Sequence, residues 1–234
     1  MKLLGNWERH QFHLRHGWPI VATLFFLVML EHLLGSVLNF GTTPFDWLLP
    51  HHIADPIWEG LCWAAFVGTV VLYATGHTHS MFAFTLTIMG VFTLALALNV
   101  WELARTLPER AGTDATRLLV DGVLIWIANV LLFTVWYWLV DGGGYLRRCE
   151  HDWAPRDFLF PPQAAKLPDY PDWHPEYLDY LFLAFCTSTA LSPADTMTLS
   201  RRGKALQILQ ALLSLIVIAL IVARAINILS SGSS

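Results

Sequence analysis

Charged residues are scarce in this chain: Asp, Glu, Lys and Arg make up 14% of its 234 residues, whereas hydrophobic residues make up 55%. In soluble domains the charged share approaches about a quarter, so this composition excludes an ordinary soluble domain. The formal net charge of −4 also excludes the basic surface that binds nucleic acid. We therefore expect a protein whose main partner is the lipid bilayer, with no nucleic-acid partner.

Cysteine is also scarce, and the motifs of common enzymes are missing. The three cysteines, Cys62, Cys149 and Cys186, are an odd number without metal-type spacing, so they form no disulfide framework. The sequence contains no nucleophile placed beside a base, no phosphate-binding loop and no HExxH zinc motif. We expect no enzyme activity, no catalytic residue and no cofactor.

Histidine is more frequent, but its positions do not point to a metal. His10, His13 and His16 would share one face of a helix, which is a spacing that can hold a metal. No carboxylate second shell is evident on that face, however, and His, Arg and Trp are common beside membranes. We interpret the three as interfacial residues and predict no metal site. Four further histidines have no predicted role: His51, His52, His77 and His79.

Long apolar runs dominate the rest of the sequence. Five are predicted to be membrane-spanning helices: residues 18–40, 61–75, 81–101, 118–140 and 204–229. A sixth run, residues 177–191, would rise about 22 Å as a helix and would not cross a hydrocarbon layer of ~30 Å. The predicted fold class is therefore an all-α polytopic membrane protein with five transmembrane helices plus one re-entrant helix.

Polar residues inside these runs are candidate functional residues. Glu31 and His32 lie about a dozen residues into the first run, where ionisable groups are costly and face protein or water rather than lipid. They form either an interhelical contact or a functional site, and the sequence leaves both open. The other intramembrane polar residues are Asp121, Asn129 and Arg224.

Two features mark the end of the fourth run. Trp136, Tyr137 and Trp138 are typical of an aromatic belt at the membrane interface. The segment after them, residues 142–176, opens with three glycines and is rich in proline and aromatic residues. We predict an extramembrane loop that packs as a cap against the membrane face.

The last quarter of the chain carries a family resemblance. Residues 185–226 read FCTSTALSPADTMTLSRRGKALQILQALLSLIVIALIVARAI. This resembles the pore module of two-helix-type potassium channels, in which a pore helix ends in T-T-x-G-Y-G-D and the inner helix reads R-x-L-A-I-L-E-A-L-L and ends in I-A-R. The matching positions are Thr189, Ala190 and Leu191 before the glycine motif, Asp195 on its aspartate, Gln210 on the inner-helix glutamate, and Ala223 and Arg224 on the Ala-Arg pair.

The resemblance implies a homotetramer that conducts monovalent cations. Ser192, Pro193 and Ala194 replace Gly-Tyr-Gly, and proline fixes φ and cannot copy a ladder of pore-facing carbonyls. A potassium-selective filter is therefore not expected. By resemblance, the filter and pore residues are Thr187, Ser188, Thr189, Ala190, Leu191, Ser192, Pro193, Ala194 and Asp195.

Asp195 has two interpretations. Four copies facing the pore would form a negative ring, which discriminates by the sign of charge rather than between cations. Alternatively, Asp195 caps the turn or pairs with Arg201 or Arg202 at the rim and never meets an ion. The sequence leaves both open.

The resemblance divides the chain into an N-terminal four-helix membrane region (1–141), the extramembrane loop (142–176) and the pore module (177–234). We expect a multi-pass protein of the cell (inner) membrane that acts as a weakly selective cation pore. The alternative is a non-conducting membrane scaffold or sensor that keeps the pore architecture. A haem protein would need paired histidines in the spans, and only His32 qualifies.

Two arguments on orientation disagree. With five spans, ten of the 14 Lys and Arg residues lie on the side of the N-terminus, which the positive-inside rule places in the cytoplasm. The resemblance instead implies that the pore loop, on that same side, enters from outside. We favour the resemblance because charges in long loops count little in the rule.

Overall fold

The structure is a computed structural model that describes residues 6–34, 50–75, 78–109, 115–144, 156–165, 173–189 and 195–231. This part of the chain is almost entirely helical, which confirms the all-α class. Its elements are α1 (Asn6–His32), α2 (His51–Thr75), α3 (Thr78–Glu109), α4 (Ala115–Val140), the 3-10 turn η2 (Asp141–Gly143), β1 (Phe158–Leu159), α6 (Pro161–Ala165), α7 (Tyr177–Ser188), β2 (Met197–Thr198) and α8 (Arg201–Ser231).

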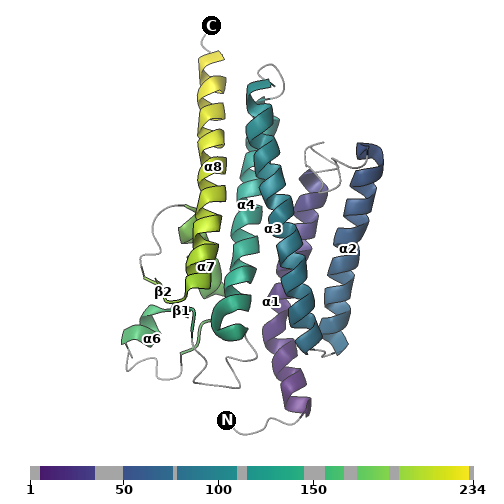
Figure 1. The fold of residues 1–234 in the computed structure, drawn as a ribbon, viewed down its shortest axis with the longest axis vertical. Coiled ribbons are helices and arrows are strands. Elements are labelled where there is room, and N and C mark those ends of the chain that lie inside the picture. The colour runs from purple at the N-terminus through teal and green to yellow at the C-terminus, as the bar shows by residue number, and fades with distance from the viewer. Residues whose placement is uncertain are drawn as a thin grey trace.

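The long helices form an elongated bundle in which the two chain ends lie at opposite ends (Figure 1). We call the end near the N-terminus, where β1, β2, α6 and the start of α8 lie, the lower end. Helix α4 is central, because α1, α3, α7 and α8 all pack against it. Its side chains Ile125, Phe133 and Val135 are fully buried. The hydrophobic core therefore follows α4 along the bundle.

Four helices in the described part of the chain are long and apolar enough to cross a membrane. Their candidate spans are His52–Thr75, Ser80–Arg105, Leu119–Gly143 and Arg201–Ala223. In α1 the described apolar stretch is shorter, Trp18–His32, and residues 35–40 of the predicted first span lie outside the description. Four long apolar helices indicate a membrane-embedded protein, whereas the predicted fifth span stays a prediction.

The boundaries of the second and third helices differ from the predicted runs. Helix α2 begins ten residues before the predicted residue 61, and the Pro50 carbonyl oxygen accepts hydrogen bonds from the N–H groups of Ile53 (2.9 Å) and Ala54 (3.0 Å). Helix α3 continues to Glu109, eight residues past the predicted end at 101. The prediction was too short because an apolar run marks only the lipid-facing part of a helix, and both helices extend into polar sequence.

A glycine turn ends α4 at the lower end. Gly142, Gly143 and Gly144 have φ angles of 60°, 80° and 101°, which lie in the left-handed region that favours glycine. The Gly144 N–H donates to the Asp141 carbonyl oxygen (3.1 Å). The three glycines thus turn the chain sharply away from α4.

Gly144→Ala is expected to lower the free energy of unfolding by about 1–2 kcal/mol, because its positive φ is strained for a residue with a Cβ. The added Cβ would also lie 3.0 Å from the Phe82 ring. Thermal unfolding in detergent, followed by circular dichroism, measures the change. Gly60→Ala is the control: no atom lies within 4 Å of its Cβ position in α2, so alanine should stabilise by up to about 1 kcal/mol. Equal stability of the two variants would contradict this account of the turn.

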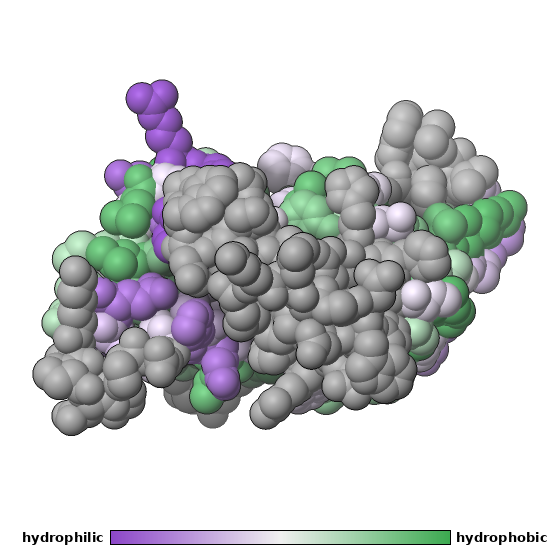
Figure 2. All heavy atoms as spheres, turned by 90° about the horizontal axis from the view of Figure 1, so that it is seen from below, coloured by the Kyte–Doolittle hydropathy of each residue, from purple (hydrophilic) through white to green (hydrophobic). Residues whose placement is uncertain are grey.

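Much of the outer surface is apolar, as a lipid environment requires. On α8, Ile208, Leu212 and Leu215 are more than half exposed and recur every three to four residues, so they form a stripe along one face. On α7, Leu178, Phe182 and Phe185 are exposed with the same spacing. Seen from the lower end, hydrophilic residues interspersed with hydrophobic ones gather on the side that carries β1, β2 and α6 (Figure 2).

Candidate functional site

Helix α7 is short and has a well-defined start. The Glu176 side chain accepts a hydrogen bond from the backbone N–H of Asp179, and the Asp179 carboxylate accepts one from the backbone N–H of Glu176 (2.7 Å). This reciprocal capping satisfies backbone donors that a helix start leaves without partners. The 12 residues of α7 give a length of about 18 Å, which is less than the ~30 Å of a hydrocarbon layer.

Helices α7 and α8 lie side by side and run in the same direction (Figure 1). The Gln210 amide donates to the Ala184 carbonyl oxygen (2.8 Å). One turn further along both helices, the Ser214 hydroxyl donates to the Ser188 carbonyl oxygen (2.6 Å). Both contacts advance by four residues on each helix, so the helices are parallel. The end of α7 lies beside Ser214, whereas β2 and the start of α8 lie at the lower end (Figure 1), so the chain comes back to that end between them.

The return segment, residues 189–200, carries most of the predicted pore residues. Ser214 lies 13 residues after Arg201, so the return covers about 20 Å along α8. It ends in β2, which pairs antiparallel with β1. Five predicted pore residues lie outside the described residues: Ala190, Leu191, Ser192, Pro193 and Ala194.

The described pore residues before the gap use their hydroxyls within the chain. Thr187 donates to the Leu183 carbonyl oxygen (2.8 Å), and Thr189 donates to the Phe185 carbonyl oxygen (3.0 Å). The Ser188 hydroxyl is buried and hydrogen-bonds with the Ser214 hydroxyl (2.7 Å). These hydroxyls hold the last turn of α7 together and fasten it to α8.

Asp195, the first described residue after the gap, is exposed. Its carboxylate acts electrostatically on Cys186, which places it near the last turn of α7. One of the two sequence interpretations needs a correction: Arg202 pairs with Asp157, as described below, and not with Asp195. The structure therefore places the Asp195 carboxylate near the end of α7.

Gln210 joins three helices toward the lower end of the bundle. Its side chain is fully buried, donates to Ala184 of α7, and accepts a hydrogen bond from the Tyr137 hydroxyl of α4 (2.5 Å). The Asn129 amide of α4 donates to the Gln210 backbone oxygen (3.4 Å). Gln210 is the residue that aligned with the inner-helix glutamate in the resemblance, and here it fixes α7 and α8 to the central helix.

Two buried carboxylates connect the end of α4 to the start of α8. Asp157 accepts two hydrogen bonds from the Arg202 guanidinium, both 2.6 Å, and one from the Gly142 backbone N–H (2.9 Å). Asp141 accepts hydrogen bonds from the backbone N–H of Asp157 (2.7 Å) and from the Tyr180 hydroxyl (2.7 Å). We call Asp141, Asp157, Tyr180 and Arg202 the lower clamp. The lower clamp connects α4, β1, α7 and α8 at the point where α7 begins.

The charge of Asp157 is stabilised by its partners. Burial alone would raise the pKa of this carboxyl, but hydrogen bonds from Arg202, Ser200 and the Gly142 backbone outweigh burial and hold the pKa below its ordinary value of 3.8. A bidentate guanidinium–carboxylate pair is the strong form of such a bond. Asp157 is therefore ionised at neutral pH.

An aromatic cluster surrounds the lower clamp. The Tyr180 ring contacts Phe158, Phe160 and Trp138, with ring centroids 6.5, 5.3 and 6.1 Å away. Tyr137 and Trp138 are buried among these rings, whereas Trp136 is half-buried. The predicted interfacial belt of residues 136–138 is therefore wrong for Tyr137 and Trp138. The Phe158 ring lies against the Tyr137 ring, with centroids 5.2 Å apart.

The structure also places the predicted intramembrane polar residues. Glu31 is hydrogen-bonded to Trp58 and Asn99, and His32 Nδ1 lies 2.8 Å from the Glu59 carboxylate. The prediction that Glu31 faces neighbouring helices is therefore confirmed, whereas the His32 side chain is 39% exposed beside Glu59, so the prediction is not confirmed for His32. Two others, Asp121 and Asn129, are buried on α4, and Arg224 lies in α8 with its side chain outside the description. These groups do not gather at one site.

The lower clamp was missed by the sequence reasoning. Its members lie far apart in the chain, and Arg202 comes 45 positions after Asp157. One signal was present: an aspartate directly before three glycines, Asp141, at a helix C-terminus where the helix dipole disfavours negative charge. Such an acid needs donors, and here two backbone N–H groups and a tyrosine supply them.

Comparison of the chain with protein families, curated proteins and solved structures finds no significant match. Its function is therefore argued from its own geometry.

Proposed function

We propose that the chain is an ion-channel-like integral membrane protein in which α7 is a re-entrant pore helix and α8 an inner helix. The single observation that carries this proposal is the parallel packing of the short α7 against the long α8, fixed at Ala184–Gln210 and Ser188–Ser214. In channels, a short helix enters the membrane and the segment after it leaves on the same side. This arrangement places backbone at membrane depth.

Burial of that backbone is the physical reason for proposing an oligomer. Non-helical chain at membrane depth is tolerated only when it is enclosed by protein or lines water. The last turn of α7 is fastened to α8 at Ser188–Ser214, and the neighbouring Leu212 and Leu215 of α8 are exposed. Four copies around an axis, with these faces inward, would enclose the return segments.

In this assembly the pore would be weakly selective for cations. Ser192, Pro193 and Ala194 cannot supply a continuous carbonyl ladder, because proline fixes φ. Exposed Asp195, near the last turn of α7, would supply negative potential from each copy. Such a charged ring selects by sign and distinguishes potassium from sodium only slightly.

One observation favours a second candidate, a non-conducting scaffold or sensor with the same architecture. Thr187 and Thr189 direct their hydroxyls to the backbone of α7 itself, and Ser188 bonds to α8. Thr187 and Ser188 are also buried within a single copy, with 8% and 2% of their surfaces exposed, so their oxygens do not face an open ion path.

Flux measurements on purified protein in liposomes test the proposal. We expect cation flux with a reversal potential close to zero under opposed potassium and sodium gradients. Asp195→Asn should reduce the preference for cations over anions, because it removes the negative ring. The control is Asp55→Asn, since Asp55 is exposed on α2 near the other end of the bundle.

Each contrary outcome has a distinct meaning. Strong potassium preference would contradict our interpretation of the Ser-Pro-Ala substitution. Unchanged cation-to-anion preference in Asp195→Asn would remove this carboxylate from the pore. Absent flux from a tetramer of correct mass would favour the scaffold, and a monomer alone in detergent would refute the tetrameric pore.

A further inference from the structure

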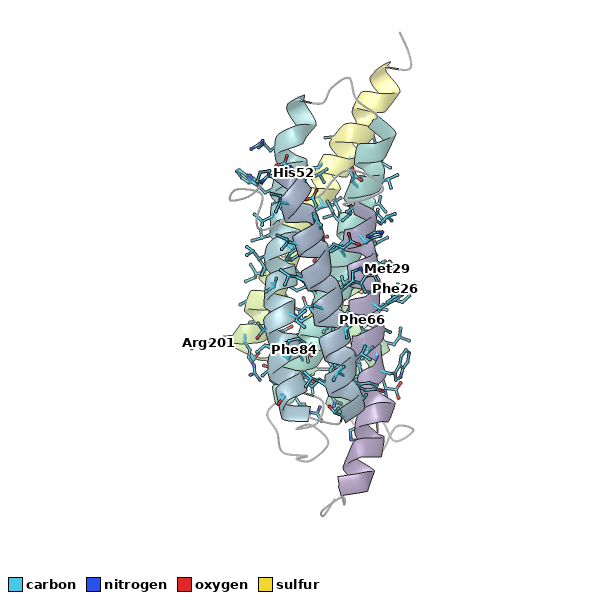
Figure 3. The ribbon with its side chains drawn as sticks, turned by 90° about the vertical axis from the view of Figure 1, so that its right-hand side faces the viewer. Phe26, Met29, His52, Phe66, Phe84 and Arg201 are labelled. Carbon is cyan, nitrogen blue, oxygen red and sulfur yellow. The ribbon has the colours of Figure 1, made fainter. Side chains whose placement is uncertain are left out.

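Three helices meet at Glu31, far from the α7–α8 pair. Glu31 of α1 is hydrogen-bonded to Trp58 of α2 and Asn99 of α3. Both partners are almost fully buried, with 8% and 1% of their surfaces exposed. In the side view, α1 and α2 lie next to each other, with His52 near the upper end of α2 and Phe66 further down (Figure 3). The carboxyl group therefore sits inside a helix junction and within the apolar part of the bundle.

More ionisable groups surround this junction. His32, the residue after Glu31, places Nδ1 2.8 Å from the Glu59 carboxylate of α2. The buried Cys62 thiol lies one turn further along α2 and interacts electrostatically with the carboxylates of both Glu31 and Glu59. Two carboxyls, an imidazole and a thiol thus lie within electrostatic reach of one another, on two adjacent helices.

The remaining ionisable groups on the neighbouring elements are few in the described part of the chain. On α3, Glu102 lies 3.8 Å from Arg105, its partner three residues later. On α4, Asp121 is buried. The test below substitutes Glu102 and Asp121 one at a time, so that protonation of either group can be distinguished from protonation of Glu31.

The partners of Glu31 indicate which ligand the junction can take. An indole N–H only donates a hydrogen bond, so Trp58 cannot ligate a metal ion. A side-chain amide both donates and accepts. An ionised Glu31 can accept from Trp58 and Asn99, and a protonated Glu31 can donate its O–H to the Asn99 carbonyl oxygen while it still accepts from Trp58. Both protonation states of the carboxyl are therefore satisfied within the same contacts.

We propose that the Glu31 junction is a proton-binding site, with Glu31 as the group that binds and releases the proton. The His32–Glu59 pair is the nearest charge pair and sets the field at the carboxyl. The junction joins Glu31 of α1 and Trp58 of α2 to Asn99 of α3. Gain or loss of the proton therefore changes the charge at the contact between the α1–α2 pair and the rest of the bundle. The proposal does not depend on ion conduction through α7 and α8.

Infrared spectroscopy of the full chain in liposomes tests the site directly, by a carboxylic C=O band that appears on acidification between about pH 9 and pH 4. The other carboxyls of the chain also protonate as the pH approaches 4 and contribute equally to the spectra of the wild type and of Glu31→Gln. We therefore expect the wild type to show one component of the band that Glu31→Gln lacks, and this variant keeps the shape and both hydrogen bonds. This component should persist in Asp55→Asn, Glu102→Gln and Asp121→Asn. Its persistence in Glu31→Gln, or its loss in Glu59→Gln alone, would overturn the assignment.

A second variant keeps the test decisive if Glu31→Gln does not fold. Trp58→Phe removes the indole donor and leaves the carboxyl in place. It should move the midpoint of the Glu31 component by more than Asp55→Asn does, because a donor to the charged form is lost. An unchanged midpoint in folded Trp58→Phe would also refute Glu31 as the proton-binding group.

Discussion

Arg202→Gln is expected to lower the free energy of unfolding by about 2–3 kcal/mol. Removing one partner of a buried ion pair costs roughly 3–5 kcal/mol, because the other charge stays buried without compensation. Here the Asp157 side chain is 1% exposed, whereas Arg202 is 57% exposed, so solvent screening lowers the value. Chemical unfolding in detergent micelles, followed by circular dichroism, measures the change.

Three comparison variants separate the pair from its surroundings. Arg201→Gln removes an exposed charge next to the same site and should change stability by no more than about 0.5 kcal/mol. Asp157→Asn should cost less than Arg202→Gln, because it leaves an exposed cation rather than a buried anion. The double variant Arg202→Gln/Asp157→Asn should recover part of the loss. No recovery would show that the ion pair is not the cause.

The pH dependence of this effect has a definite sign. The pKa of Asp157 is lower in the folded protein than its ordinary value of 3.8. The pair therefore contributes its full stability above that ordinary value, and the contribution is lost as the pH falls through the lower folded value. The difference in the free energy of unfolding between wild type and Arg202→Gln should thus be constant near neutral pH and become smaller in strong acid. A difference that grows in acid would contradict the assigned ion pair.

The helices were predictable because apolar length is a local property of the sequence. The runs at residues 81–101 and 118–140 lie within α3 and α4. The short run at 177–191 contains the whole of α7. Polar ends were harder to predict. Residues 51–60 are the first part of α2, although Pro56 and the two acids there, Asp55 and Glu59, are typical of a loop.

The lower clamp could not be predicted, because it depends on how distant segments meet. Asp157 belongs to a Pro- and aromatic-rich loop, and nothing local distinguishes it from other loop acids. Only the return of β1 to pair with β2 brings it to Arg202. The same return covers Tyr137 and Trp138, whose sequence alone is typical of a membrane interface.

The polar residues inside the spans are an intermediate case. The cost of charge in lipid predicted that Glu31 and His32 face protein. The structure confirms this for Glu31, whereas His32 is 39% exposed beside Glu59. Their partners did not follow, since Asn99 lies 68 positions further along the chain (99 − 31). The alignment with channel glutamates singled out Gln210 but not its hydrogen bond to Tyr137.

Gln210→Leu is expected to lower the free energy of unfolding by roughly 2–4 kcal/mol. The variant leaves the buried Tyr137 hydroxyl without an acceptor, and a buried polar group without a partner costs about 1–3 kcal/mol. It also removes the hydrogen bond to Ala184 that fixes the register of α7 on α8. Because that register positions the return segment, any flux in liposomes should fall with stability.

A double-mutant cycle identifies the cause of this loss. Tyr137→Phe removes the hydroxyl that would lack a partner, so Gln210→Leu/Tyr137→Phe should be more stable than Gln210→Leu, since replacing both partners by apolar groups is nearly neutral. Gln207→Leu is the matched control one turn earlier on α8. Its side chain is half-buried and accepts from Thr198 near the helix start, so it should cost less and leave α7 in place. If Gln207→Leu proved as harmful as Gln210→Leu, α7 would not be held by the contact at Gln210, and the parallel α7–α8 pair would depend on apolar packing alone.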